Sequence, residues 1–205
     1  MSQRAKQAHR RAAILIGLFL AVHFATHFSA LGGIAAQERV LQWSRLVYQF
    51  PAFEIALVVA LILQVILGIK LLVQIRKRKT KDRWHWLQFT SGCYLAYFIV
   101  NHTSAALVTR LGFGLDTNFY WAAGTLTLAP IRFLFAPYYT LAVMALVGHL
   151  IAALHFRGPS RWHAHVLLLG PIAGLAIVAG YGGAFYNIEL SNEYLDYFGA
   201  FPGVD

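Results

Sequence analysis

The feature that most constrains the fold of this chain is a series of five apolar stretches, each long enough to cross a lipid bilayer. A transmembrane helix needs about 20 mostly apolar residues to span the hydrocarbon core. The stretches cover about residues 12–33, 51–75, 85–109, 134–156 and 163–186. They leave too little chain for a separate soluble domain. The sequence therefore predicts an all-α membrane protein in which residues 1–205 form one bundle of five transmembrane helices.

The composition agrees with this fold class. Hydrophobic residues make up 59% of the 205 residues and charged residues 12%, with a mean hydropathy of +0.58. Soluble domains average about 45–50% apolar and about 25% charged residues, so this chain is too apolar to be one of them. The single cysteine, Cys93, provides neither a disulfide framework nor the ligands of an iron–sulfur cluster. The basic start MSQRAKQAHRRAA lacks a clean cleavage site after it, which predicts a retained first helix.

The basic residues predict the orientation in the membrane. Thirteen of the 17 Lys and Arg residues fall at one set of helix ends, and only Arg39, Arg45, Arg110 and Arg132 fall at the other. By the positive-inside rule, the N-terminus is then cytoplasmic, and the C-terminus, with the tail 187–205, lies outside. We expect a multi-pass membrane protein, and the family resemblance described below implies a bacterial inner membrane. The rule also explains the net charge of +9 and the loop RKRKTKDR, so no nucleic-acid partner is expected.

The outer connections have patterns of their own. The segment QERVLQWSRLVYQF has the periodicity of a short amphipathic helix lying on the outer surface. The connection 111–133 is long, aromatic and poor in charge, so we expect it to fold over the helix ends, where it can roof a site. In the last stretch, Gly170 and Gly174 form a GxxxG step, which is typical of close helix packing.

Histidines at membrane depth are the candidate functional residues. His23 and His27 in FLAVHFATHFSA are one turn apart on one helix face. Counted from the expected outer helix ends, His23 and His102 are both roughly 12–15 Å deep, whereas Gln64 and His149 are both roughly 15–20 Å deep. Ionisable groups inside a bilayer are costly and usually serve a function, although an interhelical hydrogen bond is the simpler alternative.

The other five histidines lie at the ends of the predicted spans. His155 lies at the edge of a span. We expect His9, His85, His163 and His165 to lie at the inner interface, in contact with water or lipid headgroups.

Two neutral imidazoles from facing helices at one depth are the axial ligands that a low-spin haem b requires. Small residues nearby would leave room for a flat macrocycle or for close helix packing: Gly17, Ala21, Ala25, Gly92, Ala96 and Gly148. Arg110 and Arg132, at the outer helix ends, are candidate partners for haem propionates, or ordinary interfacial arginines. A zinc ion at His23 and His27 is the competing interpretation, but it needs further ligands at the same place.

Four segments resemble the five-helix cytochrome b subunit of succinate dehydrogenases and fumarate reductases. They are GLFLAVHFATHFSA, PAFEIALVVALILQVILGIKLL, WLQFTSGCYLAYFIVNHTSA and PYYTLAVMALVGHLIAALHF, which cover most of residues 12–156. The resemblance implies two stacked haems b, each held by two histidines. His23 and His102 match the ligands of the outer haem, and His149 matches one ligand of the inner haem.

The second ligand of the inner haem should be a histidine four residues before a glycine, but this sequence has Gln64 before Gly68. A glutamine amide is a poor axial ligand, so we expect one haem b at the outer site, with two haems as the alternative. Gln64 and His149 would then bond each other or hold a quinone carbonyl. Glu54 resembles the family's glutamate at the outer quinol site. His27 is expected to bond a propionate, the quinone or a neighbouring helix instead of iron.

The resemblance implies that the chain is the membrane anchor of a succinate:quinone oxidoreductase. Its partners would be a flavoprotein and an iron–sulfur subunit on the cytoplasmic face, together with membrane quinone. The chain would transfer electrons in the respiratory chain and would not itself contain the catalytic site for succinate. Two alternatives stay open: a free-standing membrane cytochrome b linked to quinone, and a haem-free structural anchor.

Overall fold

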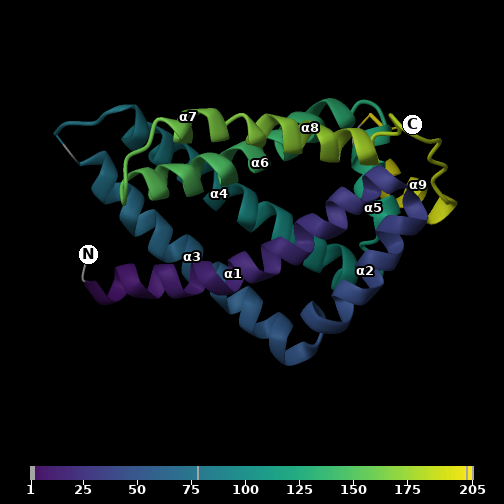
Figure 1. The fold of residues 1–205 in the computed structure, drawn as a ribbon. Coiled ribbons are helices and arrows are strands. Elements are labelled where there is room, and N and C mark those ends of the chain that lie inside the picture. Colours follow the sequence, from purple (N-terminus) through teal and green to yellow (C-terminus); the bar gives the residue numbers. More distant parts are fainter. Residues whose placement is uncertain (1–2, 78, 202, 205) are drawn as a thin grey trace.

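The structure is a computed structural model that describes residues 3–77, 79–201 and 203–204. Every regular element within this part of the chain is a helix (Figure 1). The α-helices are α1 (Gln3–Ser29), α2 (Ile34–Tyr48), α3 (Pro51–Arg76), α4 (Arg83–Leu107), α5 (Phe119–Thr127), α6 (Arg132–His155), α7 (Trp162–Val166), α8 (Leu169–Tyr181) and α9 (Asn192–Gly199). A 3-10 helix, η1 (Ala30–Gly32), follows α1, and a π-helix, η2 (Val108–Gly112), follows α4.

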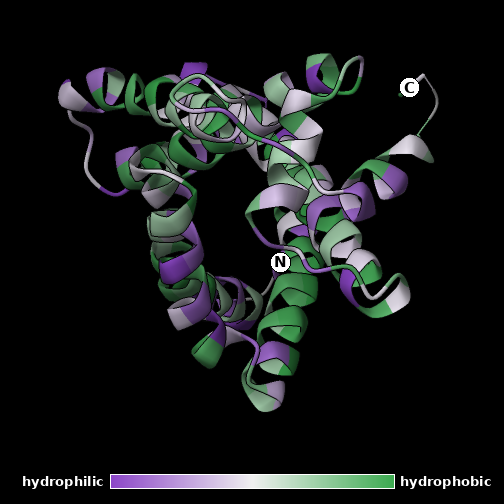
Figure 2. Cartoon of the chain, turned by 90° about the vertical axis from the view of Figure 1, so that its right-hand side faces the viewer, coloured by the Kyte–Doolittle hydropathy of each residue, from purple (hydrophilic) through white to green (hydrophobic). Residues whose placement is uncertain are grey.

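Among the residues that the structure describes, four segments are long and apolar enough to cross a membrane: Gln3–Gly32, Pro51–Arg76, Arg132–His155 and Trp162–Tyr181. Large apolar residues of these segments, such as Leu18, Ile62 and Leu150, are exposed. Figure 2 shows apolar residues distributed along the helices. Lipid favours exposed apolar side chains, and each helix also satisfies its backbone polar groups internally, as lipid requires. The predicted class of helical membrane protein agrees with this finding. The predicted span 85–109 corresponds to α4 and is not among these four segments. α4 is long enough to cross a membrane, but polar residues such as Asn101 and His102 make it less apolar than the other four.

The long helices form a layer and a crossing pair. α4, α6 and α8 pack side by side, while α1 crosses α3 and reaches α8 only near one end of the molecule (Figure 1). α3 joins the two parts by packing against α4. α1 begins at Gln3, well before the predicted start at residue 12, because its basic first turns are helical without being apolar.

The GxxxG step packs as predicted. A Cβ added at Gly170 would lie 3.0 Å from Met144 Cα, and one added at Gly174 would lie 3.0 Å from Thr140 Cα. The backbones of α8 and α6 therefore approach as closely as they do because both positions lack a side chain.

Helix starts follow capping chemistry. Asp82 Oδ1 accepts hydrogen bonds from the backbone N–H groups of Trp84 and His85, both at 2.9 Å, at the start of α4. Asn118 Oδ1 accepts one from Tyr120 N at 2.9 Å at the start of α5. These side chains satisfy donors that have no partner within the helix.

Helices α2, α5 and α9 gather at one end of the bundle, and we call them the cap (Figure 1). The predicted amphipathic helix is α2, and the long aromatic connection folds over the helix ends as α5, as expected. The tail contributes α9, a helix that the sequence analysis did not anticipate. Phe119 of α5 is 0% exposed and Phe198 of α9 is 1% exposed. Phe119 packs in a buried cluster that the cap shares with Ile177 and Tyr181 of α8, so the cap and the bundle have a common hydrophobic core.

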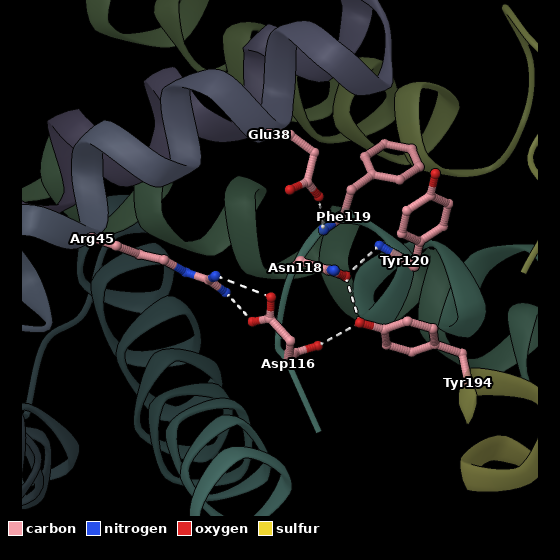
Figure 3. A network of polar contacts seen from close by, with 7 residues as sticks. All are labelled: Glu38, Arg45, Asp116, Asn118, Phe119, Tyr120 and Tyr194. Atoms are coloured by element: carbon pink, nitrogen blue, oxygen red, sulfur yellow. Dashed lines mark hydrogen bonds and ion pairs between the residues drawn. The ribbon is translucent and has the colours of Figure 1, made fainter. Parts of the chain in front are cut away.

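Polar contacts tie the three cap helices together (Figure 3). Arg45 of α2 forms a bidentate ion pair with Asp116, with nitrogen–oxygen distances of 2.6 and 3.2 Å. Burial alone would lower the pKa of Arg45, but the hydrogen bonds to Asp116 outweigh it and raise the pKa. Glu38 Oε1 accepts a hydrogen bond from Phe119 N at 3.0 Å, which links α2 to the start of α5.

The hydroxyl of Tyr194 connects α9 to the same loop (Figure 3). It lies 3.0 Å from the backbone oxygen of Asp116 and 2.9 Å from Asn118 Oδ1. Burial raises the pKa of Tyr194 to about 12, so the hydroxyl stays protonated and able to donate at neutral pH. The loop before α5 is thus held from both sides, by α2 and by α9.

Candidate cofactor site

The structure brings His23 and His27 of α1 together with His102 of α4. The ring centroids of His23 and His102 are 6.1 Å apart, with an angle of 69° between the ring planes. His27 Nε2 is hydrogen-bonded to His23 Nε2 at 3.1 Å, and its Nδ1 to the hydroxyl of Tyr181 on α8 at 3.0 Å. Three helices therefore converge on one histidine cluster, and the two residues that depth counting paired lie next to each other.

A phenylalanine one turn earlier stacks on each of the two facing histidines. Phe19 lies 5.1 Å from His23, with 27° between the planes, and Phe98 lies 4.9 Å from His102, with 13° between the planes. Such contacts restrict the rotation of each imidazole about its side-chain bonds. Neither phenylalanine was among the predicted site residues. The signal that would have found them is the repeated spacing Phe-x-x-x-His in α1 and α4.

His23 and His102 are the two imidazoles that would hold a haem iron. A metal–imidazole bond is about 2 Å long, so two rings on opposite sides of one metal ion have centroids about 6 Å apart. The observed 6.1 Å agrees with that value. Because His23 Nε2 is bonded to His27, ligation through this nitrogen requires that bond to break, after which Tyr181 still holds His27.

Metal ions that need more ligands fit less well. Among the residues that the structure describes, no group of three or more His, Cys, Asp or Glu side chains is placed to hold a metal ion. A haem iron takes only two ligands from the protein.

The cap packs against residues next to the histidine cluster. Tyr181, which is 1% exposed, stacks on Phe119 of α5 with a centroid distance of 4.9 Å. Thr26 of α1 is hydrogen-bonded through its hydroxyl to that of Ser44 of α2, at 3.0 Å, and both residues are buried. The predicted roof is therefore in direct contact with the residue that holds His27.

Three candidate residues near the cap, Arg110, Glu54 and Arg132, have partners within the protein. Arg110 forms an ion pair with Glu54, which joins the candidate propionate partner to the candidate quinol-site carboxylate. Both side chains are about one-quarter exposed, at 23% and 27%. Arg132 lies over the ring of Phe133, 4.8 Å from its centroid.

The second predicted layer is assembled differently from the expectation. Gln64 Nε2 lies 3.2 Å from Nε2 of His9, a residue that we expected at the inner interface. His149 instead has its Nδ1 3.3 Å from Ser91 Oγ. A Cβ at Gly92 would lie 3.2 Å from His149 Cε1, so the glycine provides the space for this ring. Gln64 and His149 are therefore not hydrogen-bonded to each other.

No protein-family model, curated protein or solved structure matches the chain. The resemblance noted in the sequence stays a prediction. The functional assignment therefore depends on the residues and contacts described above.

Proposed function

We propose that this chain is the haem b-containing membrane anchor subunit of a succinate:quinone oxidoreductase. It would pass electrons between cytoplasmic iron–sulfur and flavin subunits and membrane quinone. The observation that carries the proposal is the juxtaposition of His23 and His102, on two different helices, at a ring separation suited to one iron. The four segments that resemble the family support it independently of that distance.

In this proposal each residue of the cluster has one role. His23 and His102 hold the haem, and Phe19 and Phe98 keep their rings in the ligating orientation. His27, anchored by Tyr181, supplies a hydrogen bond beside the ligand. When bound, a haem b supplies a one-electron carrier at this depth.

The proposal includes the transmembrane arrangement predicted from the sequence. α4 would also cross the membrane and bring the number of spans to five, because His102 would hold a haem that lies inside the bilayer. The N-terminus would be cytoplasmic, and the basic loops would face the soluble partners.

A quinone site near the cap completes this reading. The Glu54 carboxylate can accept a proton when a quinol is oxidised, and Arg110 fixes its position through the ion pair. Arg110 lies in η2, directly after the helix that carries His102, and Glu54 lies in the first turn of α3, which packs against α4.

The test is the haem content of purified protein. We expect about one haem b per chain by pyridine haemochrome titration. We also expect a reduced-minus-oxidised spectrum that is lost in His102→Ala and largely kept in His149→Ala. Two haems per chain would contradict the stoichiometry, and the reverse pattern in the variants would place the haem in the other layer. The absence of any haem spectrum would refute the proposal.

Co-purification tests the partners. Flavin and iron–sulfur clusters that remain with the affinity-purified chain in mild detergent would support the anchor role. A haem-containing chain that purifies without them from intact membranes would point to a free-standing cytochrome b.

A further inference from the structure

A pocket lies where three segments meet, at the end of the bundle opposite the cap (Figure 1). The start of α4, the end of α6 and the loop into α7 form its walls, and its volume is about 280 Å³. Sites for small molecules occupy roughly 300–1,000 Å³, so this pocket suits a small anion or a head group better than a large cofactor. Its lining includes Arg83, Trp84, His155, Ser160 and Arg161.

Two arginines without an acidic partner give the pocket its positive charge. Neither Arg83 nor Arg161 forms an ion pair with an acid in the described part of the chain. Their guanidinium groups lie over tryptophan rings instead, 5.9 Å from the centroid of Trp84 and 5.6 Å from that of Trp162, respectively. Such contacts use no N–H donor, so both guanidinium groups can still donate hydrogen bonds to an anion.

The other polar residues of the pocket can supply further donors. His155 stacks on the buried ring of Trp84, with centroids 4.0 Å apart and 14° between the planes. Its Nδ1 lies 3.1 Å from Nδ1 of His163, so one of these nitrogens donates to the other. If His163 donates, His155 carries its proton on Nε2 and can donate to a ligand. Ser160 Oγ accepts from Trp162 N at 3.3 Å, and its hydroxyl proton is still available.

This set of donors selects an anion with several oxygens. Guanidinium groups bind carboxylate and phosphate through paired hydrogen bonds, because the forked donors match two oxygens of the anion. No acidic side chain is among the described residues that line the pocket, so nothing there would pair with the ammonium group of a zwitterion. Asp82, the acid next to Arg83, is already bonded to Trp84 N and to the ring of His85. The ligand should therefore carry a net negative charge.

The surroundings favour a phosphate that belongs to a lipid. Trp86 in the first turn of α4 and Trp162 at the start of α7 are exposed, and tryptophan is enriched where a membrane meets water. In the transmembrane arrangement proposed above, the pocket is therefore at the depth of the head groups. Leu154 and Leu168 are exposed on the adjoining segments and are available to acyl chains. Basic pockets between membrane helices on the cytoplasmic side are typical sites for anionic lipids.

We propose that this pocket binds the phosphate group of an anionic phospholipid of the cytoplasmic leaflet. Arg83 and Arg161 pair with the phosphate oxygens, and Ser160 and His155 donate further hydrogen bonds. A bound lipid thus links the start of α4 to the end of α6 and to α7. The inference goes beyond the proposed function, because it uses the proposed orientation in the membrane but needs neither haem nor soluble partners.

The test is native mass spectrometry of the full-length chain in detergent, titrated with phosphatidylglycerol and, for comparison, with zwitterionic phosphatidylcholine. We expect phosphatidylglycerol to bind more tightly. Arg83→Gln and Arg161→Gln should each raise its dissociation constant about tenfold or more, the effect of one lost charge-assisted hydrogen bond. Arg157→Gln is the matched control, because it removes the same charge from an exposed residue just after α6 that does not line the pocket. It should leave the dissociation constant unchanged.

Lysine variants guard against misfolding. Arg83→Lys and Arg161→Lys keep the charge but lose the forked donors, so they should weaken binding less than the glutamine variants do. The pocket and the histidine cluster are at different depths along the bundle, so all these variants should keep the haem content and the circular dichroism of the wild type. Only variants that do so are compared.

A competition experiment separates the lipid from free phosphate. Inorganic phosphate should not displace phosphatidylglycerol; displacement that depends on Arg83 and Arg161 would mean that the pocket is a site for the free ion. Equal weakening in Arg157→Gln would mean that only the general surface charge attracts the lipid.

One further result would overturn the inference. Unchanged lipid binding in both glutamine variants, with loss of co-purifying soluble proteins, would assign the arginines to an acidic protein partner. Failure of the proposed function has a different signature, in which a chain without a haem spectrum still binds phosphatidylglycerol through the two arginines.

Discussion

Replacing Gly174 with alanine should destabilise the bundle, although the same change in most helices is favourable. A Cβ at this position would lie 3.0 Å from Thr140 Cα and 3.1 Å from Thr140 O, both backbone atoms that cannot rotate away. Ordinary contacts of this kind are about 3.5–4.0 Å, so α8 would have to move away from α6. Overpacking of this kind costs about 1–3 kcal/mol.

Gly17 provides the matched control, because it is also inside a helix but has no heavy atom within 4 Å of an added Cβ. Alanine is favoured over glycine by about 1 kcal/mol in a helix interior, and this gain applies to both sites. The difference between Gly174→Ala and Gly17→Ala therefore isolates the packing cost. We expect Gly174→Ala to be less stable than Gly17→Ala by about 1–3 kcal/mol.

The measurement is reversible unfolding in mixed micelles with increasing sodium dodecyl sulfate, followed by far-ultraviolet circular dichroism. Gly170→Ala, which meets Met144 Cα at 3.0 Å, should behave like Gly174→Ala. Equal stability changes at Gly174 and Gly17 would show that α6 and α8 do not approach as closely as described.

Three further predictions concern the cap, the histidine cluster and a helix start. Phe198→Ala should cost the cap about 3–5 kcal/mol, measured as faster amide hydrogen exchange in α5, because the ring is 1% exposed. Tyr181→Phe should cost about 1–3 kcal/mol in the unfolding assay, because His27 Nδ1 loses its partner; an unchanged midpoint would contradict this contact. Hydrogen bonds from the backbone N–H and the ring of His85 lower the pKa of Asp82. The capping contribution of this carboxylate to stability is therefore complete above about pH 3.8, the ordinary pKa, and is lost only as the pH falls through the lowered pKa. Nuclear magnetic resonance titration of the Asp82 carboxyl carbon measures this pKa.

Hydrophobic runs predicted the long helices well, because burial in lipid or against another helix requires an apolar surface over the full length. The same signal misplaced the start of α1. Its first turns, QRAKQAHRR, contain good helix formers but few apolar residues. Hydropathy measures which solvent a segment prefers, and it does not report whether the backbone is helical. α9 was missed for a related reason, since a short helix in a polar tail has too little periodic pattern to stand out.

The paired histidines were found because ionisable side chains are rare at membrane depth, and because antiparallel helices allow depth to be counted from their ends. The same counting gave no sign that His9 contacts Gln64. It treated α1 as upright, whereas α1 crosses α3 at an angle that brings His9 beside Gln64. A crossing angle depends on side chains from both helices and cannot be read from the period of either one. Phe19 and Phe98 were missed because 15 phenylalanines leave no single one conspicuous.

The buried aromatic rings of the cap have a consequence for calorimetry. Helices that separate inside lipid exchange one apolar environment for another, so their separation changes the heat capacity little. The cap instead hides rings such as Phe119 and Phe198 from water, and hydration of these surfaces raises the heat capacity when the cap opens. If the cap lies outside the hydrocarbon, most of the heat-capacity increment on heating should come from α2, α5 and α9. Urea should then melt these three helices at concentrations that leave the bundle intact.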